Sequence, residues 1–88
     1  MLWQQVVLPD DESTNFAVAS LINGFVGACI DAGNPEGVAV YRGRTTHGEH
    51  VLYFSPVAVS IATDLLDDFG ATACVAEPSL DGMTPIPI

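Results

Sequence analysis

The sequence of 88 residues contains no lysine and only two arginines, against eleven acidic residues, so its net charge is −9. Proteins that bind nucleic acid neutralise phosphates with Lys and Arg, and two such residues cannot form a basic face. We therefore expect no nucleic-acid partner. The acids are too sparse and scattered for an acidic mimic of DNA, and solubility is the simplest interpretation of the charge.

Charge of either sign is scarce: charged residues make up 15% of the chain and apolar residues 49%. That composition excludes a disordered segment, which would be poor in apolar residues. A chain of this length forms one small domain whose core cannot hide so much apolar surface. Self-association is the expectation that follows.

Cysteine is also scarce, and Cys29 and Cys74 lack the spacing of a zinc or redox motif. We expect both thiols to be reduced and buried, with no metal and no cofactor. The N-terminus has no basic region or cleavage site typical of a signal peptide. The apolar stretch 16–30 is interrupted by polar residues and glycines, and we expect it to be too short to span a bilayer. These features predict a cytoplasmic protein without a membrane partner.

Hydrophobic periodicity predicts two helices and four strands. One helix follows N-cap candidates at 10–14 and ends at Gly33; the other begins with Ser55 as N-cap and Pro56, and ends at Gly70. The strands are predicted at 2–8, 37–43, 50–55 and 71–77.

The order β-α-β-β-α-β predicts an α+β, ferredoxin-like fold, in which a four-stranded antiparallel sheet carries two helices on one face. Residues 1–77 would form this single domain. Residues 78–88 would be an extended, Pro-rich tail without regular structure. The fold by itself does not indicate a function.

The predicted strands are apolar on both faces, although an antiparallel sheet open to water normally alternates apolar and polar residues. Something must therefore cover the face opposite the helices. A second copy of the chain is the favoured cover, with Trp3, Tyr41 and Tyr53 at the interface. The chain's own tail or a different protein are the alternatives.

All the basic groups lie in the stretch YRGRTTHGEH (41–50). A small anionic ligand could be bound by Arg42, Arg44, His47 and His50, since guanidinium groups match carboxylate and phosphate. A metal site involving His47, Glu49 and His50 is a weaker alternative. The simplest interpretation is a solvated hairpin whose arginines pair with acids. Asp64, Asp67 and Asp68, near the end of the second helix, are candidate partners for the arginines across a subunit interface.

The sequence contains no nucleophile elbow and no phosphate-binding glycine loop. If the protein were an enzyme, His50, Tyr53 and Arg42 would be the weak catalytic candidates. The sequence favours a small, self-associating, non-enzymatic module that binds a partner protein or a small ligand. The alternative is a small dimeric ferredoxin-like enzyme or ligand sensor that uses the Arg/His hairpin cluster.

Overall fold

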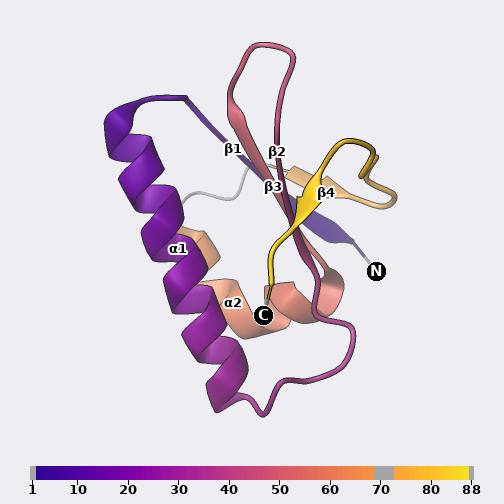
Figure 1. The fold of residues 1–88 in the computed structure, drawn as a ribbon. Helices are drawn as coiled ribbons and strands as arrows, with labels where there is room; N and C mark the ends of the chain where they lie inside the picture. Colours follow the sequence, from indigo (N-terminus) through magenta and orange to yellow (C-terminus); the bar gives the residue numbers. More distant parts are fainter. Residues whose placement is uncertain (1, 69–72, 88) are drawn as a thin grey trace.

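A computed structural model describes residues 2–68 and 73–87 of the protein. It is an α+β domain in which two helices pack on one face of a five-stranded antiparallel sheet (Figure 1). The elements are β1 (Trp3–Leu8), α1 (Glu12–Asp31), β2 (Val40–Arg44), β3 (His50–Phe54), α2 (Pro56–Asp68), β4 (Ala73–Val75) and β5 (Thr84–Pro85).

The sheet has the strand order β4-β1-β3-β2-β5, with all neighbours antiparallel. The prediction of four strands is wrong by one, because part of the tail joins the sheet as β5. The second strand begins at Val40 rather than at 37, because Gly37 adopts a left-handed φ of 84° that extended backbone does not allow. Residues 71–72 of the predicted last strand lie outside the described residues.

Helix α1 begins and ends as its sequence predicts. The backbone N–H of Thr14 donates to Asp11 Oδ1 at 2.7 Å, so Asp11 is the N-cap. At the other end Gly33 has a φ of 80° and donates to the Ile30 carbonyl, while Asn34 donates to the Cys29 carbonyl. This is the Schellman pattern, in which a left-handed glycine lets the chain turn back and satisfy the last carbonyls.

Ser55 starts α2 and also connects it to the segment before β2. Its Oγ accepts from the Ala58 N–H at 3.3 Å, which is the N-cap bond. The same oxygen accepts from the Ala39 N–H at 2.9 Å and donates to the Gly37 carbonyl at 2.8 Å. One buried hydroxyl therefore positions the start of a helix against the approach to a strand that lies 16 residues earlier.

The core lies between the helices and the sheet. Phe25 of α1 meets Phe54 of β3 edge to face, with ring centroids 5.4 Å apart. The other buried apolar residues of this cluster are Val6, Val18, Leu21, Cys29, Val40, Leu52, Ala58, Ala62 and Leu66. Most of the predicted apolar face of α2 is buried or partly buried; Phe69 lies outside the described residues.

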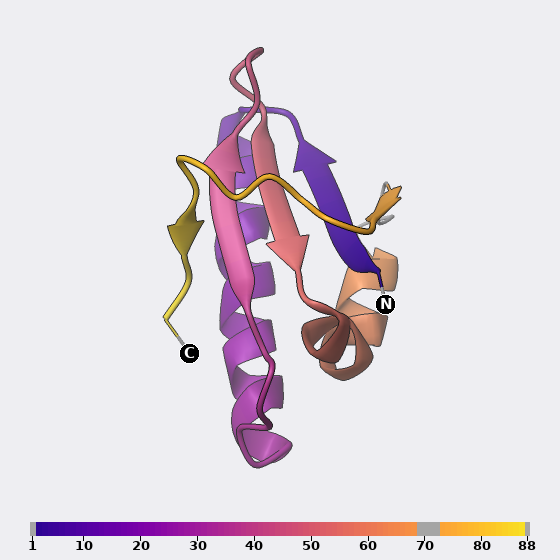
Figure 2. The same ribbon diagram turned by 90° about the vertical axis from the view of Figure 1, so that its right-hand side faces the viewer.

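The tail crosses the face of the sheet opposite the helices, from the β4 edge to the β2 edge (Figure 2). A Cβ on Gly43 would lie 3.1 Å from Met83 Cε, so the Met83 side chain packs on Gly43. Val51, opposite Gly43 in the register, is only 6% exposed. The Ile86 N–H then donates to the Val40 carbonyl at 2.9 Å. The expectation of a tail without regular structure is wrong, because the unpaired backbone groups of the β2 edge offer it hydrogen bonds.

Helix α1 is long, apolar and poorly covered. It spans 20 residues with a mean hydropathy of 1.4, and 22% of this apolar window is buried. By length and composition alone it could cross a membrane, so the expectation that this segment is too short is wrong. Phe16 is 78% exposed and Ile30 is 62% exposed.

Candidate functional site

The candidate site lies where β1 ends and the β2–β3 hairpin begins, and it is centred on His50. The strand register places His50 of β3 between Leu8 of β1 and Arg44 of β2. The turn itself is closed by hydrogen bonds between Thr45 and Glu49, and Gly48 adopts the left-handed φ of 82° that the sequence predicts. The hairpin thus holds Arg44 and His50 side by side.

His50 is 1% exposed, and its imidazole is part of the packed interior. Nε2 lies 2.6 Å from Asn15 Oδ1 and 3.3 Å from Asp10 Oδ1. Because both neighbours are oxygen acceptors, Nε2 carries a proton and donates it. Nδ1 is buried and has no hydrogen-bond partner among the described residues.

Asp10 connects the histidine to the hairpin arginine. Its Oδ2 accepts from Arg44 Nη1 at 2.8 Å, and the same nitrogen donates to the Gly48 carbonyl at 3.0 Å. Both side chains are about half exposed, at 52% for Arg44 and 48% for Asp10. An ion pair this exposed contributes only about 0–1 kcal/mol, so its main effect is to fix the hairpin against the start of α1.

The structure brings together only part of the predicted basic cluster. Arg44 and His50 share the Asp10 carboxylate, whereas Arg42 and His47 are exposed and form no ion pair within residues 2–68 and 73–87. In this part of the chain no group of three His, Cys, Asp or Glu residues could hold a metal ion. Asp64, Asp67 and Asp68 are exposed, and Arg44 pairs with Asp10 instead of with them.

The weak catalytic candidates do not converge. His50 alternates with Tyr53 along β3, so His50 faces the helices and the Tyr53 ring lies on the opposite face of the sheet. There the Gln5 Nε2 group donates to the Tyr53 hydroxyl at 3.2 Å. Tyr53 and Arg42 also project to opposite faces, because Tyr53 pairs with Tyr41 in the register and Arg42 pairs with Leu52.

Tyr53 instead belongs to the group of rings that the sequence assigns to an interface. Trp3 and Tyr41 lie with ring centroids 6.2 Å apart and planes inclined by 43°. All three rings are partly exposed. The tail covers part of the same face (Figure 2), so the chain itself supplies some of the cover that its strands require.

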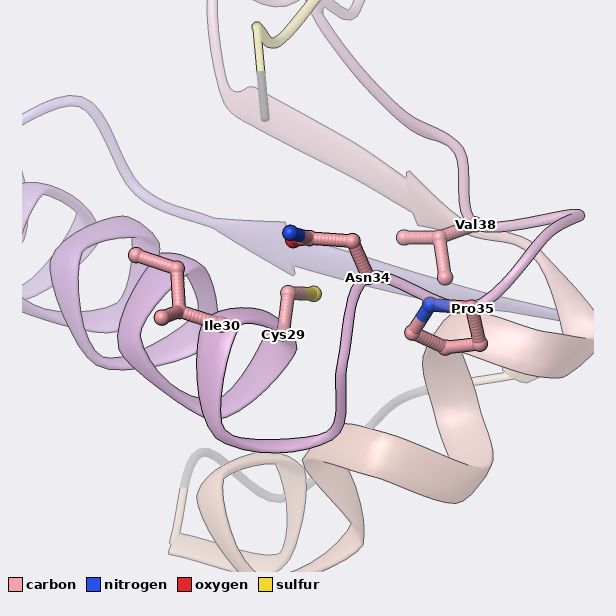
Figure 3. A pocket seen from close by; sticks show the side chains of 5 residues that line it. All are labelled: Cys29, Ile30, Asn34, Pro35 and Val38. Atoms are coloured by element: carbon pink, nitrogen blue, oxygen red, sulfur yellow. The ribbon is translucent and has the colours of Figure 1, made fainter.

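A pocket of about 360 Å³ opens at the end of α1 (Figure 3). Cys29 and Ile30 line it from the helix, Asn34 and Pro35 from the following loop, and Val38 from the approach to β2. Its only polar side chain is the Asn34 amide, and Asn34 already closes the helix through its backbone. None of the five lining side chains carries a charge.

The two cysteines have different environments. Cys29 is buried, and desolvation raises the pKa of its thiol. Cys74 is exposed on the edge strand β4, with its Sγ 3.6 Å from Gln4 Oε1. Both are free, but the expectation that both are buried is wrong for Cys74, because the short edge strand leaves this side chain uncovered.

Asp10 and Asn15 were not predicted as partners of His50. Both lie beside the predicted start of α1, where short polar residues are expected as caps. Only the pairing of Leu8 with His50 reveals that this helix start meets the hairpin.

The chain matches no protein-family model, no curated protein and no solved structure.

Proposed function

We propose that the protein is a small, self-associating binding module without catalytic activity. The observation that carries this proposal is the surface of α1. Its residues 13–30 include no charged side chain, although the chain has a net charge of −9. Within this stretch Phe16 is 78% exposed and Ile30 is 62% exposed. Soluble proteins seldom expose contiguous apolar surface, and where they do it marks an interaction site.

The environment of His50 supports the non-enzymatic part of the proposal. A general base must come within hydrogen-bond reach of the proton that it abstracts. In this chain His50 Nε2 is occupied by Asn15 and Asp10, and Nδ1 is buried. The imidazole therefore acts as a structural link between β3 and the start of α1.

We also propose that the sheet is a ferredoxin-like arrangement with one added strand. The order β4-β1-β3-β2 within the sheet supports this, as do the positions of α1 between β1 and β2 and of α2 between β3 and β4. In this view β5 extends the β2 edge. The arrangement leaves two surfaces for a second copy, namely the sheet face with Trp3, Tyr41 and Tyr53, and the outer face of α1.

A second candidate function is the binding of a small anion at Arg42. Its side chain is exposed, and among the described residues it takes part in no ion pair. Titration with inorganic phosphate followed by NMR tests this candidate. Saturable shifts centred on Arg42 that disappear in Arg42→Gln would support it, and shifts independent of Arg42 would refute it.

Sedimentation equilibrium over a range of protein concentrations tests the main proposal. We expect a concentration-dependent rise from the chain mass of 9.2 kDa to twice that value. Added salt should strengthen the association, because it screens the repulsion between two chains of charge −9. A single species of 9.2 kDa at every concentration and salt would refute self-association.

A further inference from the structure

We infer that α1 forms the self-association surface, by pairing antiparallel with α1 of a second copy. This inference rests on the proposed function and selects one of its two candidate surfaces. Six residues define the outer face of α1, which we call the α1 seam. They are Phe16, Ala19, Asn23, Val26, Gly27 and Ile30.

The α1 seam lies opposite the buried side of the helix. The buried residues Val18, Leu21, Phe25 and Cys29 follow the helical spacing of three and four. Gly24 packs toward α2, where a Cβ would lie 3.4 Å from the Leu65 side chain. A Cβ on Gly27 would meet nothing within 4 Å, so the seam side is open. In Figure 1 α1 lies at the margin of the domain, with the sheet and α2 on the same side of it.

The spacing of the seam is that of a helix pair. Phe16, Asn23 and Ile30 recur every seven residues, and Ala19 and Val26 occupy the intermediate positions. These are the a and d positions of a heptad repeat, which keep one face toward a partner helix. An exposed helix face in a monomer would normally carry charged residues instead.

The seam is also self-complementary about Asn23. Phe16 and Ile30 lie seven residues before and after it, so an antiparallel pair centred on Asn23 places Phe16 against Ile30 of the second copy. Ala19 then lies opposite Gly27, and these small side chains leave room for the Phe16 ring. The Asn23 amide would meet its own symmetry mate, where each amide offers both a donor and an acceptor.

Charge favours a second copy over a lipid surface. Helices that bind membranes carry Lys and Arg beside their apolar face, whereas α1 has neither and the chain is strongly acidic. Pairing two copies brings no charged side chain into the seam between Glu12 and Asp31. The antiparallel alignment sets Asp31 of each copy opposite Asn15 of the other, within one turn of Glu12, so the carboxylates at the two ends of the pair repel and added salt should strengthen it.

The size of the seam predicts a weak dimer. A helix of 20 residues is about 30 Å long, and one such pair buries less than the roughly 1,200–2,000 Å² of a standard interface. We therefore expect association that depends visibly on concentration.

One seam variant, a matched charge control and a sheet-face variant test the seam by sedimentation. Phe16→Glu replaces the largest apolar side chain of the seam with a charge and should raise the dimer dissociation constant more than roughly tenfold. Ser60→Glu adds the same charge at an exposed position of α2 and should leave the constant unchanged. Trp3→Gln alters the sheet face and should also leave it unchanged. Circular dichroism establishes that each variant is folded.

A cross-linking experiment tests the register. In a Cys74→Ser background, Asn23→Cys should form an intermolecular disulfide with oxidised glutathione, because the two thiols meet at the symmetry axis. Ser60→Cys in the same background is the matched control and should remain monomeric on a non-reducing gel.

The outcomes separate failure of the seam from failure of the proposed function. A dimer that survives Phe16→Glu but is lost in Trp3→Gln overturns the seam and leaves self-association intact. A wild-type chain that is monomeric at all concentrations overturns both. A monomer that binds vesicles of neutral phosphatidylcholine through Phe16 also overturns the seam and assigns α1 to lipid.

Discussion

Replacing Ser55 with Ala should destabilise the fold more than any other loss of a single hydroxyl in the described part of the chain. The Ser55 hydroxyl is buried and takes part in three hydrogen bonds, with Ala58, Ala39 and Gly37. Loss of an N-cap costs about 1 kcal/mol. The partly buried Ala39 N–H would lose its partner, at a further cost of about 1–2 kcal/mol, whereas the carbonyl of the exposed Gly37 can bind water.

The expected total is about 2–3 kcal/mol, a large part of the roughly 5–15 kcal/mol that stabilises a small domain. The melting temperature should fall by about 10–20 °C for a domain of this size. Urea denaturation monitored by circular dichroism measures the change. The slope of the free energy of unfolding against urea concentration should be the same for wild type and variant.

Ser60→Ala is the matched control. Ser60 lies on the same helix, is exposed, and donates only to the Val57 carbonyl. It should change the free energy of unfolding by less than about 0.5 kcal/mol. If Ser55→Ala changes it no more than this control, the hydroxyl does not connect α2 to the approach to β2. Faster hydrogen exchange at the Ala39 amide in Ser55→Ala would identify the segment released.

Three further predictions follow from the cap, the cysteines and the tail. Asp11→Asn keeps an N-cap acceptor but removes its charge. The hydrogen bond from the Thr14 N–H lowers the pKa of Asp11, so its stabilisation is present above the ordinary value of 3.8 and is lost as the pH falls through the lower folded-state value. The gap in melting temperature between wild type and variant should therefore close below pH 3.8, and a gap independent of pH would contradict the role of the charge. A maleimide should label exposed Cys74 rapidly and buried Cys29 only on unfolding, as mass spectrometry of the peptides would show; equal rates would contradict their different burial. Removing residues 78–88 should lower the melting temperature and increase hydrogen exchange at Val40 and Val51, because Met83 packs on Gly43, the register partner of Val51, and β5 pairs with β2; unchanged exchange would mean that the tail is not docked.

Local chemistry allowed the helix ends and the hairpin turn to be predicted from the sequence. The N-cap bond of Ser55, the turn at Gly33 after α1 and the hairpin turn at Gly48 each involve residues at most five positions apart. The side chain or the permitted φ of each residue is sufficient to specify these structures. The residue pattern of the strands likewise predicted that both faces of the sheet are apolar. It therefore also predicted that something must cover the face opposite the helices.

Contacts between distant segments could only be found in the tertiary structure. The partners of His50, the exposure of Cys74 and the path of the tail across Gly43 depend on which strands are neighbours and in which register. Hydrophobic periodicity identifies a strand but does not indicate which strand lies beside it. The free energy that selects β5 as the cover of the β2 edge comes from backbone hydrogen bonds and side-chain packing between residues about 40 positions apart.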